Sequence, residues 1–110
     1  MEITVSQLEA YLHERYRGWT TEQGLFMKLV EEMGEIAEVL NKRSGAKAAG
    51  EEDLQVALGN ELADLIHYAV AIAAISNIDL TNTMLNKDRA ASVKYHHDTN
   101  LETFIANSHK

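Results

Sequence analysis

Two pairs of acidic residues occur three positions apart, on segments that are otherwise rich in apolar residues. Glu32 and Glu35 form the first pair, and Glu61 and Asp64 form the second. Residues at positions i and i+3 of a helix share one face, so each pair presents two carboxylates to the same side. Four converging carboxylates with a few water molecules suit a hard divalent cation such as Mg²⁺, which also accepts phosphate oxygens. The pairs therefore predict a magnesium site, with Mn²⁺ as an alternative ion, and chemistry on a phosphate ester or anhydride.

The first pair lies on a helix whose apolar residues recur with helical spacing. Glu32 and Glu35 are expected on one flank of the apolar stripe, with Leu25 and Val39 beside them, whereas the charges of a surface helix normally lie opposite such a stripe. The stripe itself consists of Phe26, Leu29, Val30, Met33, Ile36, Ala37 and Leu40.

The second pair is placed even less like ordinary surface charge. Glu61 projects almost along the middle of an apolar stripe, and Asp64 lies one turn further on at its edge, near Tyr68. A buried carboxylate costs several kcal/mol unless it is paired, neutralised or bound to metal. This helix has no Lys or Arg to supply a partner, so Glu61 requires one from elsewhere. The stripe comprises Leu54, Leu58, Leu62, Leu65, Ala69 and Ile72.

Two other interpretations of these acids compete with the magnesium site. They could be solvated or salt-bridged surface residues of a helical oligomerisation or partner-binding module, although that leaves Glu61 unexplained. Alternatively, Asp64 and His67 resemble half of a carboxylate-bridged di-iron site, in which Glu-x-x-His motifs occur on two helices. The chain has only one such motif, and Glu32 and Glu35 have no histidine companion.

Composition and charge exclude several other classes of protein. The chain has 110 residues, which suits a single domain over residues 1–110, and it contains no cysteine and no proline. Its net charge of −7 argues against a nucleic-acid partner, which would require clustered Lys and Arg. The longest apolar run, 62–75, is interrupted by Asp64 and His67, and the N-terminus lacks the pattern of a signal peptide. We therefore expect a cytoplasmic protein with no membrane partner.

The spacing of apolar and capping residues predicts an all-α bundle of four main helices, with no strands. A capping box formed by Ser6 and Glu9 should begin the first helix, which ends near Arg17. Thr20 or Thr21 should cap the second, over 22–43, and 44–50 should be a loop. The third should follow the acidic residues 51–53 and end near 76; the fourth should run from a cap at 79 to about 97, followed by a loosely held tail.

The acidic residues and their context resemble a known family. Glu31-Glu32-x-x-Glu35 followed by Glu61-x-x-Asp64 is similar to the EExxE…ExxD signature of the MazG-like all-α nucleotide pyrophosphohydrolases, and the resemblance extends over about 24–95. It implies that Glu32, Glu35, Glu61 and Asp64 bind magnesium. It also implies hydrolysis of nucleoside triphosphates to the monophosphate and pyrophosphate, as house-cleaning of the nucleotide pool. The family's architecture implies a homo-oligomer, a dimer or a dimer-based tetramer, in which a second chain completes the active-site bundle.

Further residues are candidates for catalysis and substrate binding. Glu31 or Glu38 could hold a further metal ion or orient the attacking water. Lys28 could reach a phosphate or remain a surface lysine, and Trp19 could stack on a base or anchor the packing between two helices.

The fourth helix departs from the family pattern at its phosphate-binding residues. Family members often carry a Lys-Asn-x-x-Arg-Tyr-like run, where this chain has Ala90-Ala91-Ser92-Val93-Lys94-Tyr95. Lys94 and Tyr95 match the end of that run, whereas alanines replace the Lys-Asn pair. Lys87 and Arg89, one turn earlier, are expected to compensate, since both residue types bind phosphate.

Overall fold

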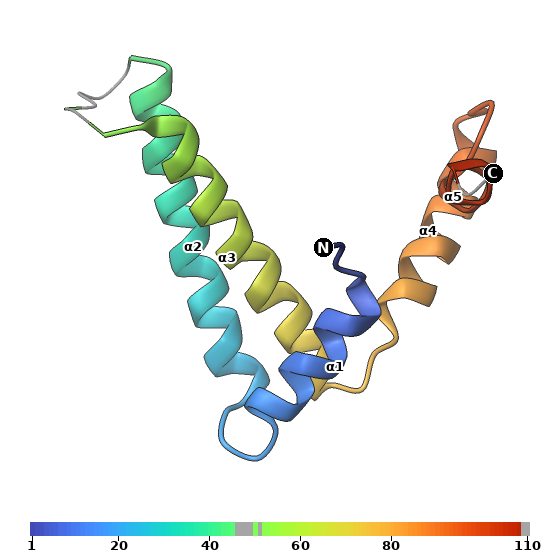
Figure 1. Ribbon diagram of the computed structural model, residues 1–110, viewed down its shortest axis with the longest axis horizontal. Coiled ribbons are helices and arrows are strands. Elements are labelled where there is room, and N and C mark those ends of the chain that lie inside the picture. The colour runs from blue at the N-terminus through green and yellow to red at the C-terminus, as the bar shows by residue number, and fades with distance from the viewer. Residues whose placement is uncertain (46–49, 51, 109–110) are drawn as a thin grey trace.

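The computed structural model describes residues 1–45, 50 and 52–108, and these form five helices arranged as an open V. α2 (Glu22–Arg43) and α3 (Leu54–Ile75) lie side by side as one arm, α1 (Val5–Tyr16) crosses at the base, and α4 (Leu80–Lys94) with α5 (Leu101–Ser108) forms the other arm (Figure 1). The described residues contain no strand, so the all-α prediction is confirmed. The described residues contain the four main helices that were predicted and, in addition, the short eight-residue helix α5.

A small core joins α1 to the α2–α3 hairpin at the base of the V. Leu12 is completely buried there, and Ala71 and Ala74 of α3 are small enough to let α1 approach closely. The remaining buried members of this cluster are Tyr16, Leu25 and Val70. α1 also contacts α4, so it joins the hairpin arm to the α4–α5 arm.

The buried face of α2 differs from the predicted stripe by about one residue step. Leu25 and Val39 are buried, whereas Met33 and Phe26, which were expected in the apolar stripe, are more than half exposed. α2 has more apolar positions than one neighbouring helix can cover, so the packing against α3 decides which of them are buried. As a result, Glu32 lies on the side of α2 that faces α3 rather than on its flank.

The first helix begins two residues earlier than predicted. Thr4 is its N-cap, and a capping box joins Thr4 to Gln7 instead of Ser6 to Glu9. Glu9 is used elsewhere, because its Oε1 accepts a hydrogen bond of 2.7 Å from the backbone N–H of Leu80 at the start of α4. The prediction failed because both Thr4 and Ser6 satisfy the local rule, and the contact with α4 recruits Glu9.

The remaining helix boundaries follow the predicted caps more closely. Thr21, Asp53 and Asp79 each accept backbone N–H groups at the start of α2, α3 and α4. α2 has the predicted bounds, and α3 ends one residue early. The predicted loop at 44–50 is described only at residues 44, 45 and 50.

The C-terminal part of the chain departs from the prediction. α4 stops at Lys94 instead of continuing to about His97, and His96 adopts a positive φ of 58°. The tail then forms α5, which was not predicted. Asp88 of α4 accepts a 2.6 Å hydrogen bond from the N–H of Leu101, so a contact with the preceding helix fixes the start of α5. A distant contact of this kind leaves little trace in the local pattern.

α3 is long and apolar enough to cross a membrane, judged by length and composition alone. It also carries Glu61 and Asp64, which a lipid environment would strongly disfavour. Its packing between α1 and α2 accounts for the apolar residues at its centre and C-terminal half.

Candidate metal centre

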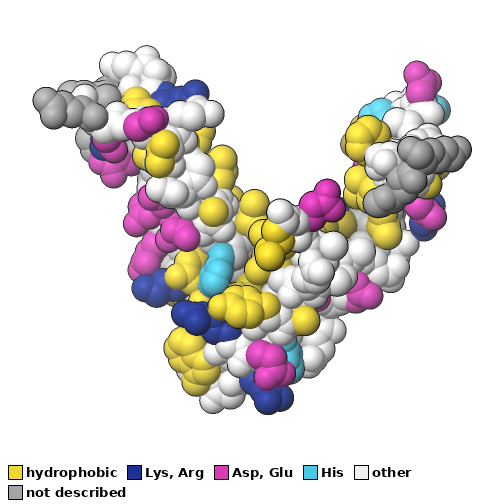
Figure 2. Space-filling model, viewed as in Figure 1, with side chains coloured by type: hydrophobic (Ala, Val, Ile, Leu, Met, Phe, Trp, Pro, Cys, Tyr) yellow, Lys and Arg dark blue, Asp and Glu magenta, His cyan; other side chains and the backbone are white. Residues whose placement is uncertain are grey.

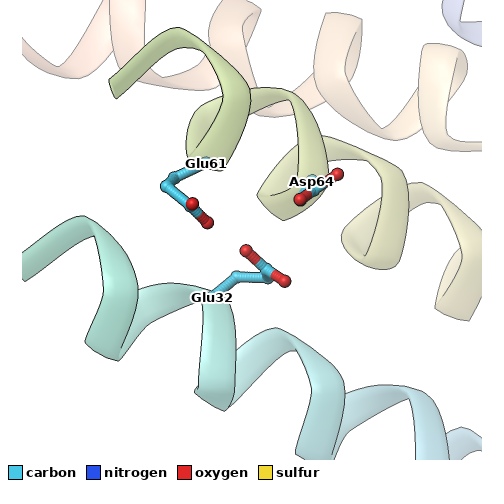
Figure 3. A group of neighbouring side chains, drawn as sticks. All are labelled: Glu32, Glu61 and Asp64. Carbon is cyan, nitrogen blue, oxygen red and sulfur yellow. The ribbon is translucent and has the colours of Figure 1, made fainter. Parts of the chain in front are cut away.

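Three of the four predicted metal ligands converge between α2 and α3. Glu32 of α2 and Glu61 and Asp64 of α3 each offer one carboxylate oxygen, and these three atoms all lie within 4.8 Å of one another. Figure 3 shows Glu32 and Glu61 extending into the space between the two helices, with Asp64 one turn along α3. Ligands at about 2.1 Å from an octahedral Mg²⁺ are about 3 to 4 Å apart, so small side-chain adjustments bring this group to coordination distance.

The burial of two oxygens in this group fits a site that binds a cation. Oε2 of Glu32 and Oε2 of Glu61 are shielded from solvent and have no hydrogen-bond partner among the described residues. A buried carboxylate oxygen without a partner is costly, and two in one place add electrostatic repulsion. A divalent cation removes both penalties at once. The donor set, made entirely of oxygen, fits Mg²⁺ or Mn²⁺ and does not fit a thiolate- or imidazole-preferring metal.

Glu35, the fourth predicted ligand, lies beside this group rather than within it. Its side chain is exposed, and its contact with the Glu61 carboxyl, together with the charge of Glu61, raises the pKa of Glu35 above the ordinary value of 4.5. Burial raises the pKa of Glu32, and the charges of Glu35 and Asp64 add to that rise, while its contact with Glu61 acts in the opposite direction. The four carboxyls therefore form one electrostatic unit, in which Glu32 and Glu61 are partly buried and Glu35 and Asp64 are exposed.

These pKa shifts predict how the metal-free protein responds to pH. Folded Glu32 and Glu35 hold protons more tightly than the unfolded chain does, so the folding free energy they contribute is most favourable below pH 4.5 and is lost as pH rises through their raised folded values. In EDTA, acidification from pH 7 to pH 5 should therefore stabilise the wild type more than Glu32→Gln. Urea unfolding at the two pH values measures this difference. Identical pH responses of the two proteins would contradict the coupling.

The candidate catalytic residues Glu31 and Glu38 lie outside the carboxylate group. Both are exposed, because Glu31 lies about 100° and Glu38 about 240° around α2 from Glu32. The Glu31 carboxylate pairs with Nζ of Lys28 at 3.6 Å, on the exposed side of the helix. Lys28 thus has an acidic partner already, and its predicted role in phosphate binding requires that it exchange this partner for the substrate.

His67 does not join the carboxylates, which removes the basis for a di-iron site. Its Nε2 lies 2.8 Å from Oη of Tyr16, in a hydrogen bond that links α3 to α1. Burial lowers the pKa of His67, and the nearby positive charge of Arg15 lowers it further, while Asp64 opposes the shift. His67 is therefore neutral at neutral pH and acts as part of an aromatic cluster.

This aromatic cluster lies beside the carboxylates and was only partly predicted. The ring of His67 contacts the rings of Tyr16 and Tyr68 edge to face, at centroid distances of 5.7 Å and 5.0 Å. Burial is the main cause of the raised pKa of Tyr68, and the negative charges of Glu32 and Asp64 raise it further. Tyr68 follows Asp64 by one helical turn, which the spacing reveals. Tyr16 has no such signal, since its place depends on how α1 packs.

Trp19 extends this cluster toward solvent. It lies in the turn after α1 with 66% of its surface exposed, its ring is 5.3 Å from that of Tyr16, and its indole N–H donates to the carbonyl of Arg15. The indole is thus fixed by the end of α1 while keeping much of its surface free. Both sequence interpretations, a stacking surface and a packing anchor, are compatible with this position.

The predicted phosphate-binding residues of α4 are on the opposite arm of the V. α4 packs on α5 and on the start of α1, so within one chain Lys87, Arg89, Lys94 and Tyr95 are separated from the carboxylates (Figure 1). Arg89 binds the side chains of Asn86 and Glu102, and Nζ of Lys94 lies 5.3 Å from the centre of the Tyr95 ring. A single chain does not bring the basic and acidic halves of the predicted site together.

Comparison with known proteins finds a family match over the segment that contains the acidic helices. A model of the MazG nucleotide pyrophosphohydrolase domain matches residues 20–90, which include all four carboxylates and most of α4. The chain is also similar to dCTP pyrophosphatase 1 of Rattus norvegicus, with 35% identity over 68 residues. That alignment covers 59% of this chain and 40% of the length of the rat protein.

Proposed function

The chain belongs to the MazG nucleotide pyrophosphohydrolase family, and we propose that it hydrolyses nucleoside triphosphates to the monophosphate and pyrophosphate in a Mg²⁺-dependent reaction. One structural observation supports this proposal in addition to the family match. Glu32, Glu61 and Asp64 converge from two helices, and two of their oxygens are buried without a partner. Such a group is unfavourable in a purely structural protein and is useful in one that binds a cation with a phosphate chain.

Different residues of the chain would bind the metal ion and orient the attacking water. Glu32, Glu61 and Asp64 would hold Mg²⁺, and the accessible Glu35 would complete the ligand set as the nucleotide binds. When bound, Mg²⁺ polarises a water molecule and neutralises charge on the leaving pyrophosphate. Water adds its oxygen to the α-phosphorus as the bond to the bridging oxygen breaks, and a carboxylate accepts the proton. Glu31 and Glu38 remain the candidates for orienting this water.

The aromatic cluster gives the nucleotide a second point of contact. Trp19 offers an exposed ring next to the Tyr16–His67–Tyr68 group, and such a ring can stack on a base. The similarity to a dCTP pyrophosphatase makes dCTP the first substrate to test. The proposed role is removal of unwanted nucleotides from the cytoplasmic pool.

Two observations support a homo-oligomer. Four exposed apolar residues of α2, Phe26, Val30, Met33 and Leu40, follow one another with Ala37 at alternating steps of four and three, the spacing of a helix–helix seam. The radius of gyration is 17.1 Å, whereas a compact chain of this length has about 13 Å. Dimers and dimer-based tetramers both satisfy these observations.

A pyrophosphate-release screen tests the proposed activity. The protein is incubated with each common ribo- and deoxynucleoside triphosphate, with Mg²⁺ or with EDTA, and nucleoside monophosphate and pyrophosphate are measured separately. We expect equal amounts of both products, only with the metal. Release of inorganic phosphate with a diphosphate, or no turnover of any nucleotide, would refute the proposal.

A further inference from the structure

A hydrogen bond between Tyr16 and His67 joins the last residue of α1 to α3. Oη of Tyr16 lies 2.8 Å from Nε2 of His67, and this is the one side-chain hydrogen bond between the two helices in the part of the chain that the structure describes. The core around it is apolar, and Leu12 and Ala71 are completely buried there. Apolar packing is not directional, whereas a hydrogen bond is, so this bond fixes how the end of α1 is oriented on α3.

The two partners of this bond lie between the carboxylate group and Trp19. His67 follows the candidate ligand Asp64 by three residues, which is about 4.5 Å along α3. The ring of Tyr16 lies 5.3 Å from that of Trp19, whose indole N–H donates to the carbonyl of Arg15. A continuous series of contacts therefore links α3 to the exposed indole. Figure 2 shows acidic, histidine and hydrophobic side chains next to one another on the arm that α2 and α3 form.

The core does not need a polar pair at this place for its stability. Tyr16 is buried and His67 is half-buried, in surroundings that are largely apolar. Replacing both partners of such a hydrogen bond by apolar side chains of similar shape is often nearly neutral, whereas removing one partner leaves the other unsatisfied. Apolar side chains at both positions would thus hold α1 on α3 about as firmly. The property that they would not supply is a defined orientation of the two helices.

We infer that Tyr16 and His67 are positioning residues, whose hydrogen bond holds the Trp19 ring in place relative to the carboxylates, so that one nucleoside triphosphate stacks its base on the ring while its phosphates reach the cation. This inference rests on the proposed function. The pair acts through Trp19 and does not touch the substrate in this arrangement. A ligand that has the phosphates but no base should therefore bind equally well with or without the pair.

The test uses the double variant Tyr16→Phe with His67→Leu, which removes the hydrogen bond without leaving a partner unsatisfied. Its melting temperature should stay within about 5 °C of wild type. Calorimetry with Mg²⁺ measures the binding of α,β-imido-dCTP, which cannot be cleaved at the α-phosphorus, and of inorganic tripolyphosphate, which has no base. We expect the variant to bind the nucleotide analogue about ten-fold more weakly, since stacking of a base on an aromatic ring is worth about that much, and tripolyphosphate within about two-fold of wild type.

The fluorescence of Trp19 gives a second readout, because it is the only tryptophan of the chain. The analogue should quench this fluorescence in the wild type, whereas tripolyphosphate should not. His67→Gln keeps a side chain that can hydrogen-bond to Tyr16 and should retain most of the affinity. The control is Ser6→Ala with Thr81→Val, which removes a 2.9 Å side-chain hydrogen bond between α1 and α4 and should leave both affinities unchanged.

The possible outcomes separate this inference from the proposed function. The inference is overturned if the double variant binds the analogue as tightly as the wild type, or if its affinity for tripolyphosphate falls to the same extent. It is also overturned if the analogue leaves the fluorescence of Trp19 unchanged, or if the double variant melts far below the wild type, which would show a structural role. A wild type that binds neither ligand and hydrolyses no nucleotide refutes the proposed function, and this inference with it.

Discussion

Glu61→Gln is expected to reduce pyrophosphate release at least 100-fold and to raise the stability of the metal-free protein. The loss of activity follows because an amide cannot replace the charge of a central ligand, and even outer-shell partners of metal sites are worth about 10- to 100-fold. The gain in stability follows because the substitution removes one of three carboxylates held within 4.8 Å of one another. Initial rates with Mg²⁺, and thermal unfolding in EDTA, measure the two effects.

The control for Glu61→Gln is Glu14→Gln. Glu14 is an exposed acid of α1 that pairs with Arg17 at 3.4 Å and is not part of the carboxylate group, and surface pairs of this kind contribute little. Its activity and metal-free stability should stay close to wild type. The site assignment fails if Glu61→Gln retains wild-type turnover, or if it lowers metal-free stability as an ordinary core substitution would.

Leu12→Ala is expected to cost about 3 kcal/mol of unfolding free energy, a large fraction of the total for so small a domain. Leu12 is completely buried between α1 and α3, in a core with few other fully enclosed side chains. The neighbouring alanines of α3 cannot expand to fill the space, so a cavity remains. Urea unfolding at fixed protein concentration in EDTA measures the loss.

Met27→Ala provides the comparison for Leu12→Ala. Met27 is 59% exposed on α2, and its truncation should change the unfolding free energy by no more than about 0.5 kcal/mol. Equal effects of the two substitutions would show that α1 is not anchored by this core. The α4–α5 arm would then not be anchored to the hairpin through α1, since Glu9 of α1 accepts a hydrogen bond from the start of α4.

The convergence of Glu32, Glu61 and Asp64 could be predicted from the sequence, because an acidic residue in an apolar stripe is an anomaly that the local pattern reveals. Glu61 interrupts an apolar stripe on a helix without Lys or Arg, so its need for a partner is visible without coordinates. The caps at Thr21 and Asp79 were predictable for the same reason, since each depends on a side chain and the N–H groups that follow it. In both cases the signal that permits the prediction lies within a few residues of the sequence.

Features that depend on contacts between distant segments were not predictable. Glu9 looked like the end of a capping box, but it accepts a bond from Leu80, 71 positions away. α5 begins where Asp88 reaches the N–H of Leu101, which neither periodicity nor composition indicates. The opening of the V, which separates Lys87 and Lys94 from the carboxylates, likewise depends on how α1 packs against the elements on either side.

The most direct test of the metal centre is a crystal structure grown with Mn²⁺ and a non-hydrolysable triphosphate, with anomalous scattering to locate the ion. We predict a peak between α2 and α3, with oxygens of Glu32, Glu61 and Asp64 at coordination distance, about 2.1 Å for the corresponding Mg²⁺ complex. Crystals with no peak at that place, or with the ion bound elsewhere while the three carboxylates contact only protein or water, would contradict the account.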